Sequence, residues 1–126
     1  MIALSRLLKL QSLYAVLGVL FNVVSLILIS QGGEPLTPNQ PIQGLVVMTI
    51  YGLMLISGFL NKETIYKAFM VLAVLLLGYG GVFNHLNFLR ESPELYHSVA
   101  AGVIGVGINI FGLILNIIAA LGKYKK

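Results

Sequence analysis

The chain has no cysteine, no tryptophan and few charged residues. Without cysteine it can form no disulfide, thiolate metal site, iron–sulfur cluster or thiol nucleophile. Only 10% of its 126 residues are charged, against ~25% in an average soluble domain, and so small a globule exposes much of its surface. A share of 58% hydrophobic residues is too high for a disordered chain. An ordinary soluble domain, a secreted disulfide scaffold and a disordered protein are therefore excluded.

The few charged residues stand in clusters, separated by four long charge-free stretches. The stretches cover residues 10–33, 35–61, 68–89 and 95–122, and the mean hydropathy of the chain is +0.95. Each is at least as long as the ~20 residues that a helix needs to cross a bilayer. Runs such as residues 71–77 lack the in-out alternation of barrel strands. We therefore expect an all-α membrane protein with one domain, residues 1–126, and helical spans at about residues 10–29, 42–60, 66–84 and 99–119.

The positions of lysine and arginine predict the orientation of these spans. Seven of the eight lie at the N-terminus, in the second loop or at the C-terminus: Arg6, Lys9, Lys62, Lys67, Lys123, Lys125 and Lys126. Only Arg90 lies in the first or third loop. We expect an antiparallel up-down bundle in a bacterial inner membrane, with both termini in the cytoplasm. The net charge of +4 then reflects topology and indicates no nucleic-acid partner.

Two segments carry local signals for helix ends. Ser92, Pro93 and Glu94 suit the N-cap, the first helical position and the positive end of a helix dipole, so we expect the fourth helix to start near Pro93. The run Gly78-Tyr79-Gly80-Gly81 holds three glycines in four residues, which predicts a kink or an unwound segment in the third helix.

Small and polar residues recur every three or four positions in the spans, which places them on single helix faces. In lipid such faces meet other helices, because small residues allow close approach and amides form interhelical hydrogen bonds. The residues assigned to helix packing on this basis are Gly18, Gly78, Gly81, Gly102, Gly105, Gly112 and Asn116.

Three polar residues fall near the midpoints of their spans: Asn22, Tyr51 and Asn109. We expect Asn22 and Asn109 to share a hydrogen-bonded layer in the middle of the membrane. Two interpretations stay open. The layer fixes helix packing and register, or it lines a path for a small solute, because transporters bind their substrates between helices at this depth.

The only histidines, His85 and His97, fall at the ends of the third and fourth spans that one loop connects. Glu94 precedes His97 by three residues, on the same face if the segment is helical. The cluster His85, Glu94 and His97 is thus a candidate for haem ligation, metal binding or pH sensing. The alternative is a pair of interfacial histidines that bond loop backbone or water.

No arginine or carboxylate lies within the four spans, and the one lysine, Lys67, stands at the very start of the third, so acid-base catalysis deep in the membrane lacks its usual groups. We therefore expect no enzymatic activity and no cofactor. The first hypothesis is an accessory or assembly subunit of a membrane complex, with the bilayer and either other subunits or further copies of itself as partners. One alternative is a small oligomeric channel or transporter for a neutral or weakly charged solute. A second is a haem or metal site at His85 and His97.

Overall fold

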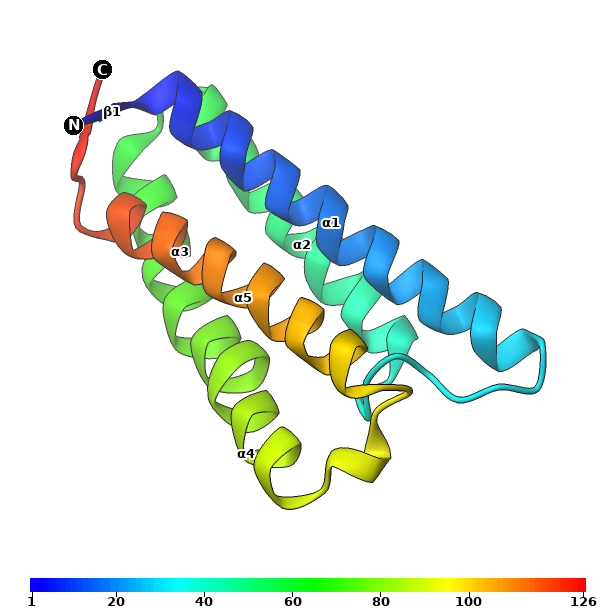
Figure 1. The fold of residues 1–126 in the computed structure, drawn as a ribbon. Coiled ribbons are helices and arrows are strands. Elements are labelled where there is room, and N and C mark those ends of the chain that lie inside the picture. The colour runs from blue at the N-terminus through cyan, green and yellow to red at the C-terminus, as the bar shows by residue number, and fades with distance from the viewer.

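The computed structural model describes all 126 residues and is predominantly helical (Figure 1). The elements in chain order are β1 (Ile2–Ala3), α1 (Leu4–Ser30), α2 (Pro41–Phe59), α3 (Glu63–Leu77), η1 (Gly78–Phe83), α4 (Asn84–Glu91), η2 (Pro93–Leu95), α5 (Val99–Ala120) and β2 (Tyr124–Lys125). The π-helix η1 joins α3 and α4 into one continuous rod of 29 residues, Glu63–Glu91.

Four helices are long and apolar enough to cross a membrane: α1, α2, the rod Glu63–Glu91, and α5. The prediction of four such helices is confirmed; α1 and the rod Glu63–Glu91 run well beyond the predicted cores, whereas α2 and α5 match theirs to within one residue. The 27 residues of α1 are the clearest case, because at ~1.5 Å per residue they extend about 40 Å, more than the ~30 Å hydrocarbon layer. Its first turns, which carry Arg6 and Lys9, can therefore stay helical at the polar boundary.

Helix α1 packs along α2, α5 packs against both α1 and α3, and α2 also contacts α3 (Figure 1). At one end of the bundle, called the termini end here, β1 pairs with β2 in parallel register, Ile2 opposite Tyr124. The turn between α2 and α3 lies there too, because Lys126 forms an ion pair with Glu63 at 3.5 Å. At the other end, called the loop end, the segments 31–40 and 92–98 meet, and the His97 N–H donates to the Leu36 carbonyl at 3.4 Å.

The loop end differs from the sequence prediction at the start of the last helix. Helix α5 begins at Val99, and the N-cap is Ser98, whose side chain accepts a 3.0 Å hydrogen bond from the Ala101 N–H. Pro93 opens only the short 3-10 helix η2, because the backbone becomes extended at Tyr96. The predicted start near Pro93 is therefore wrong.

The glycine run of the third helix also differs from expectation. Residues Gly78–Phe83 form a π-helix, and the rod neither stops nor unwinds there. A π-helical turn places one extra residue in the helix, which shifts the faces of α3 and α4 relative to each other. Two glycines of this segment, Gly80 and Gly81, line the cavity described below, and Gly78 lies against Leu113 of α5.

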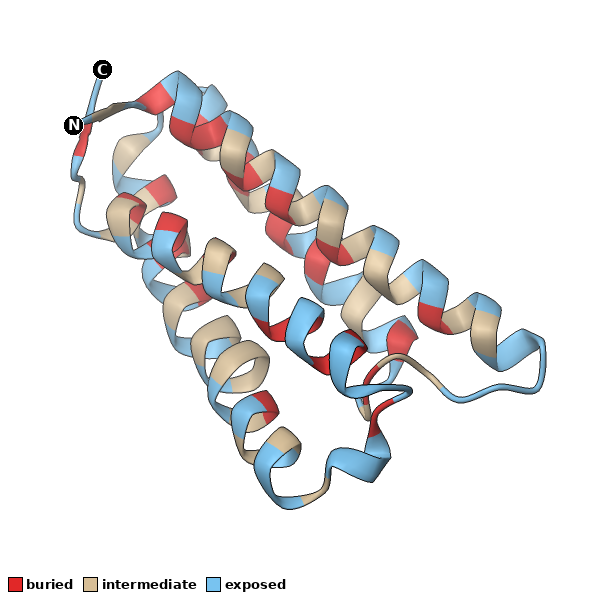
Figure 2. Cartoon of the chain, in the orientation of Figure 1, coloured by how far each residue is buried: buried red, intermediate tan, exposed pale blue.

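Buried residues gather on the faces that the helices turn toward one another (Figure 2). The core lies mainly in the termini half and centres on Leu7, Tyr14, Tyr51, Tyr66 and Met70, all at most 2% exposed. Large apolar side chains such as Leu53, Leu75 and Val103 are well exposed on the outer faces. Such a surface is unfavourable in water and suits lipid.

Candidate functional site

The loop half of the bundle contains a partly open cavity of about 470 Å³, within the usual range of ~300–1,000 Å³ for ligand sites. Its walls come from α1, α2, the segment 31–40, the rod Glu63–Glu91 and α5. None of the lining residues is charged. Six carboxamide side chains, a hydroxyl and an imidazole supply the polar groups: Asn22, Asn39, Gln40, Gln43, Asn84, Asn109, Thr37 and His85.

Two of the cavity amides lie against glycines of neighbouring helices. A Cβ atom built on Gly44 of α2 would lie 2.1 Å from the Oδ1 of Asn22 on α1. A Cβ on Gly81 of η1 would lie 2.9 Å from the Cγ of Asn109 on α5. Any side chain at either glycine would therefore push the amide aside, so both amides occupy space that only glycine leaves free.

The predicted hydrogen bond between Asn22 and Asn109 is not formed. The Nδ2 of Asn22 donates to the Gly18 carbonyl of its own helix at 2.8 Å, and the Oδ1 of Asn109 accepts from the Tyr14 hydroxyl at 3.2 Å. Both residues nevertheless line the same cavity. The Oδ1 of Asn22 and the Nδ2 of Asn109 have no hydrogen-bond partner in the chain, which leaves one acceptor and one donor for a solute.

Beyond the Tyr14–Asn109 bond, toward the termini end, a buried polar network joins four helices. It consists of Gln11 on α1, Tyr51 on α2, Tyr66 on α3 and Asn116 on α5, all at most 2% exposed. The Oδ1 of Asn116 accepts from the Tyr51 hydroxyl at 2.6 Å and from the Gln11 Nε2 at 3.0 Å. The Tyr66 hydroxyl donates to the Oε1 of Gln11. This network fills the bundle between the cavity and the termini end.

Tyr51 therefore occupies a different place from the predicted solute path, because it belongs to the network and not to the cavity lining. The central positions of Gln11 and Tyr66 in this network were not predicted from the sequence. A signal was present for Tyr66, since Tyr66, Met70 and Ala73 recur at helical spacing and all three are buried.

The glycines assigned to packing lie against other elements of the same chain. The nearest side chains are Met48 for Gly18, Leu113 for Gly78, Asn109 for Gly81, Leu89 for Gly102, Phe21 for Gly105 and Tyr14 for Gly112. Asn116 is fully buried. The small-residue face of α5 therefore packs against side chains of the same chain.

His85 lies at the cavity wall with both ring nitrogens hydrogen-bonded. Its Nε2 lies 2.8 Å from the Asn39 Nδ2, and its Nδ1 lies 2.8 Å from the Tyr96 hydroxyl. Because the Asn39 amide N–H donates, the Nε2 accepts and the Nδ1 carries the proton. The Tyr96 hydroxyl in turn donates to the His85 carbonyl at 3.2 Å, and burial raises the pKa of Tyr96, which keeps this phenol neutral.

The other two members of the predicted ligand cluster lie apart from this arrangement. Glu94 and His97 are exposed, and only the backbone N–H of His97 makes a hydrogen bond across the loop end. No three histidine or carboxylate side chains are placed to hold one metal ion. The structure does not assemble His85, Glu94 and His97 into a joint ligand set.

No known protein family, curated protein or solved structure matches the chain. The function must therefore be argued from the cavity.

Proposed function

We propose that this chain is a small integral membrane protein that binds an uncharged polar solute in the loop-end cavity and carries it across the membrane, without catalysing a reaction. The observation that supports this is a cavity with six carboxamides and no charged side chain. Carboxamides both donate and accept hydrogen bonds, which suits hydroxyl and amide groups. A bare ion would lose its hydration shell in this cavity, and no counter-charge would compensate for that loss.

The proposal includes an orientation. The four helices alternate in direction, both termini face the cytoplasm of a bacterial cell, and the cavity lies in the outer half of the inner membrane. The support is the excess of lysine and arginine at the termini end, because these residues mark the cytoplasmic side of membrane proteins. The solute then enters from outside, and the network around Asn116 is the barrier that it must pass.

The accessory-subunit hypothesis is less favoured by the packing. That role placed the glycine and asparagine faces against the chain itself or against partner helices, and Gly102, Gly105 and Gly112 are in contact with side chains of the same chain. A haem or metal site is less favoured as well, because both ring nitrogens of His85 have partners.

The test is osmotic swelling of proteoliposomes that contain the purified chain. We expect glycerol, urea and acetamide to enter faster than into empty liposomes, and sodium acetate not to enter. The decisive variant is Asn22→Leu, because the only hydrogen bond of Asn22 is to its own helix, so the substitution removes no hydrogen bond between helices. Thr49→Val is the matched control, since the Thr49 hydroxyl is exposed and also bonds its own helix.

We expect Asn22→Leu to slow solute entry at least several-fold while Thr49→Val behaves as the wild type. Two results would refute the proposal: no entry of any uncharged solute into wild-type proteoliposomes, or equal rates for Asn22→Leu and the wild type.

A further inference from the structure

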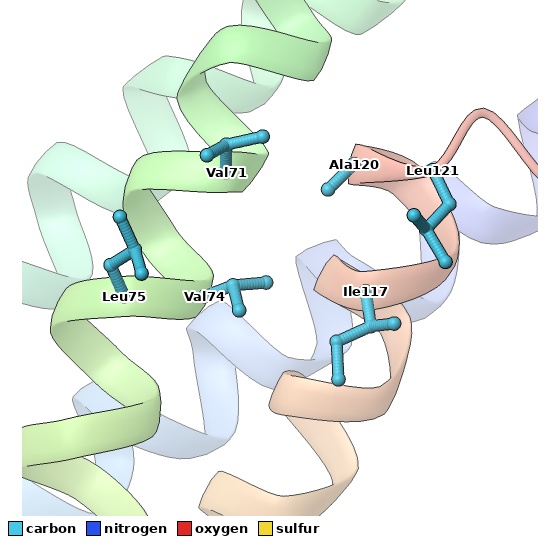
Figure 3. Close-up of a pocket in the computed structure, with 6 residues that line it drawn as sticks. All are labelled: Val71, Val74, Leu75, Ile117, Ala120 and Leu121. Carbon is cyan, nitrogen blue, oxygen red and sulfur yellow. The ribbon is translucent and has the colours of Figure 1, made fainter.

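A second, smaller hollow lies on the surface of the bundle between α3 and the end of α5. It has a volume of about 140 Å³ and only apolar side chains line it (Figure 3): Val71, Val74, Leu75, Ile117, Ala120 and Leu121. Leu75 and Leu121 are 64% and 66% exposed, so the groove is open to the surroundings along the helices. Its shape and chemistry suit a stretch of one hydrocarbon chain.

A cationic side chain stands at the termini end of this groove. Lys67 precedes Val71 by one helical turn, so both lie on the same face of α3. The Lys67 ammonium lies against Gly122, directly after Leu121, because a Cβ on Gly122 would be 2.8 Å from the Lys67 Nζ. Gly122 has a φ of +64°, so this close approach occurs at a position that favours glycine.

The Lys67 ammonium has no carboxylate partner in the chain. The one ion pair at this end joins Lys126 to Glu63, which stands one turn before Lys67 on α3. Lys67 also lies 5.8 Å from the centroid of the Tyr124 ring, and Lys123 follows Gly122 in sequence. The groove therefore ends at an ammonium that forms no ion pair within the chain, with a second lysine, Lys123, close by in the sequence.

We propose that this groove is a binding site for an anionic phospholipid, with an acyl chain between α3 and α5 and the phosphate on Lys67. Charge complementarity selects the occupant, because an apolar groove that ends in an unpaired cation matches a molecule that joins a hydrocarbon tail to an anionic head. The site is separate from the loop-end cavity and does not depend on the function proposed for it.

The test is native mass spectrometry of the full chain, released from nanodiscs that hold equal amounts of phosphatidylglycerol and phosphatidylcholine. We expect the wild type to retain phosphatidylglycerol in preference to phosphatidylcholine. Lys67→Gln should lower that preference about fivefold, the factor that corresponds to one lysine near an anionic membrane surface. Lys9→Gln on α1 is the matched control, because it removes the same charge elsewhere on the chain and should keep the preference.

A second variant tests the groove itself. Ala120→Phe fills the space between α3 and α5 and leaves every charge in place, so we expect retention of both lipids to fall. Equal loss of preference in Lys67→Gln and Lys9→Gln would show a diffuse attraction and overturn the proposal. Three further results would overturn the proposal. The wild type could retain both lipids equally, Ala120→Phe could retain as much lipid as the wild type, or free glycerol phosphate could displace the bound lipid.

Discussion

The hydroxyl of Tyr51 on α2 donates a 2.6 Å hydrogen bond to the Oδ1 of Asn116 on α5, and neither side chain reaches the surface. The same oxygen accepts from Gln11 on α1, which in turn accepts from Tyr66 on α3. A single amide thus ties together helices that lie far apart in sequence. The Nδ2 of Asn116 has no partner, so this residue serves the network as an acceptor.

Asn116→Leu should destabilise the protein by about 1 to 3 kcal/mol, because two hydrogen bonds are lost and the buried Tyr51 hydroxyl loses its acceptor. The measurement is the free energy of unfolding in an SDS titration. Thr49→Val removes an exposed hydroxyl that bonds only its own helix and should change stability by less than about 0.5 kcal/mol. Equal effects of the two substitutions would argue against a stabilising role for the network.

Two glycines on α5 provide a matched pair for the packing argument. A Cβ on Gly112 would lie 2.4 Å from the Tyr14 ring, whereas a Cβ on Gly107 would meet nothing within 4 Å. We expect Gly112→Ala to cost about 1 to 3 kcal/mol, because Tyr14 must move and its bond to Asn109 is strained. Gly107→Ala should not lower the free energy of unfolding, and the higher helix propensity of alanine can raise it by up to about 1 kcal/mol. Thermal unfolding in detergent distinguishes the two, and a reversed order would contradict the packing described.

The absence of native cysteine makes the proposed orientation directly measurable with single introduced cysteines. In intact cells a membrane-impermeant maleimide should label Gln31→Cys and Leu95→Cys at the loop end. It should label Ser5→Cys and Lys123→Cys only after the cells are broken. Labelling of Ser5→Cys and Lys123→Cys on opposite sides of the membrane would refute the alternating topology. Labelling of both in intact cells would show that the termini face outward, opposite to the proposed orientation.

Gly44→Ala should impair the cavity without removing any polar group from its lining. The new methyl group would collide with the Asn22 amide and displace it into the cavity, so solute entry into proteoliposomes should fall several-fold. Gly52→Ala lies on the same helix, where an added methyl group meets nothing within 4 Å, and should leave entry unchanged. A normal rate for Gly44→Ala would show that the position of Asn22 does not matter.

The four long helices were predictable because lipid imposes a simple requirement: charge-free stretches long enough to cross it. The glycines of α5 were also predictable as a packing face, since spacing alone determines which residues share a side of a helix. Their partners were not, because spacing does not say whether Gly112 meets Tyr14 of the same chain or a residue of another protein.

The site itself was visible only in part from the sequence. Asn22 and Asn109 stood out as isolated amides in apolar surroundings, yet their bonding depends on helix rotation and on the glycines opposite them. Gln40 and Gln43, at the start of α2, gave no comparable signal in the sequence, yet both line the cavity. The start of α5 was misplaced because Ser92-Pro93-Glu94 carries the same local signals as a true helix start, and extended backbone at Tyr96 interrupts it.

The parallel pairing of Ile2 with Tyr124 and Ala3 with Lys125 brings the first and last segments of the chain side by side. A short peptide linker can therefore join Met1 to Lys126 without altering the bundle. New ends can then be opened in the segment 31–40, which would give a circularly permuted protein in which all four helices keep their neighbours.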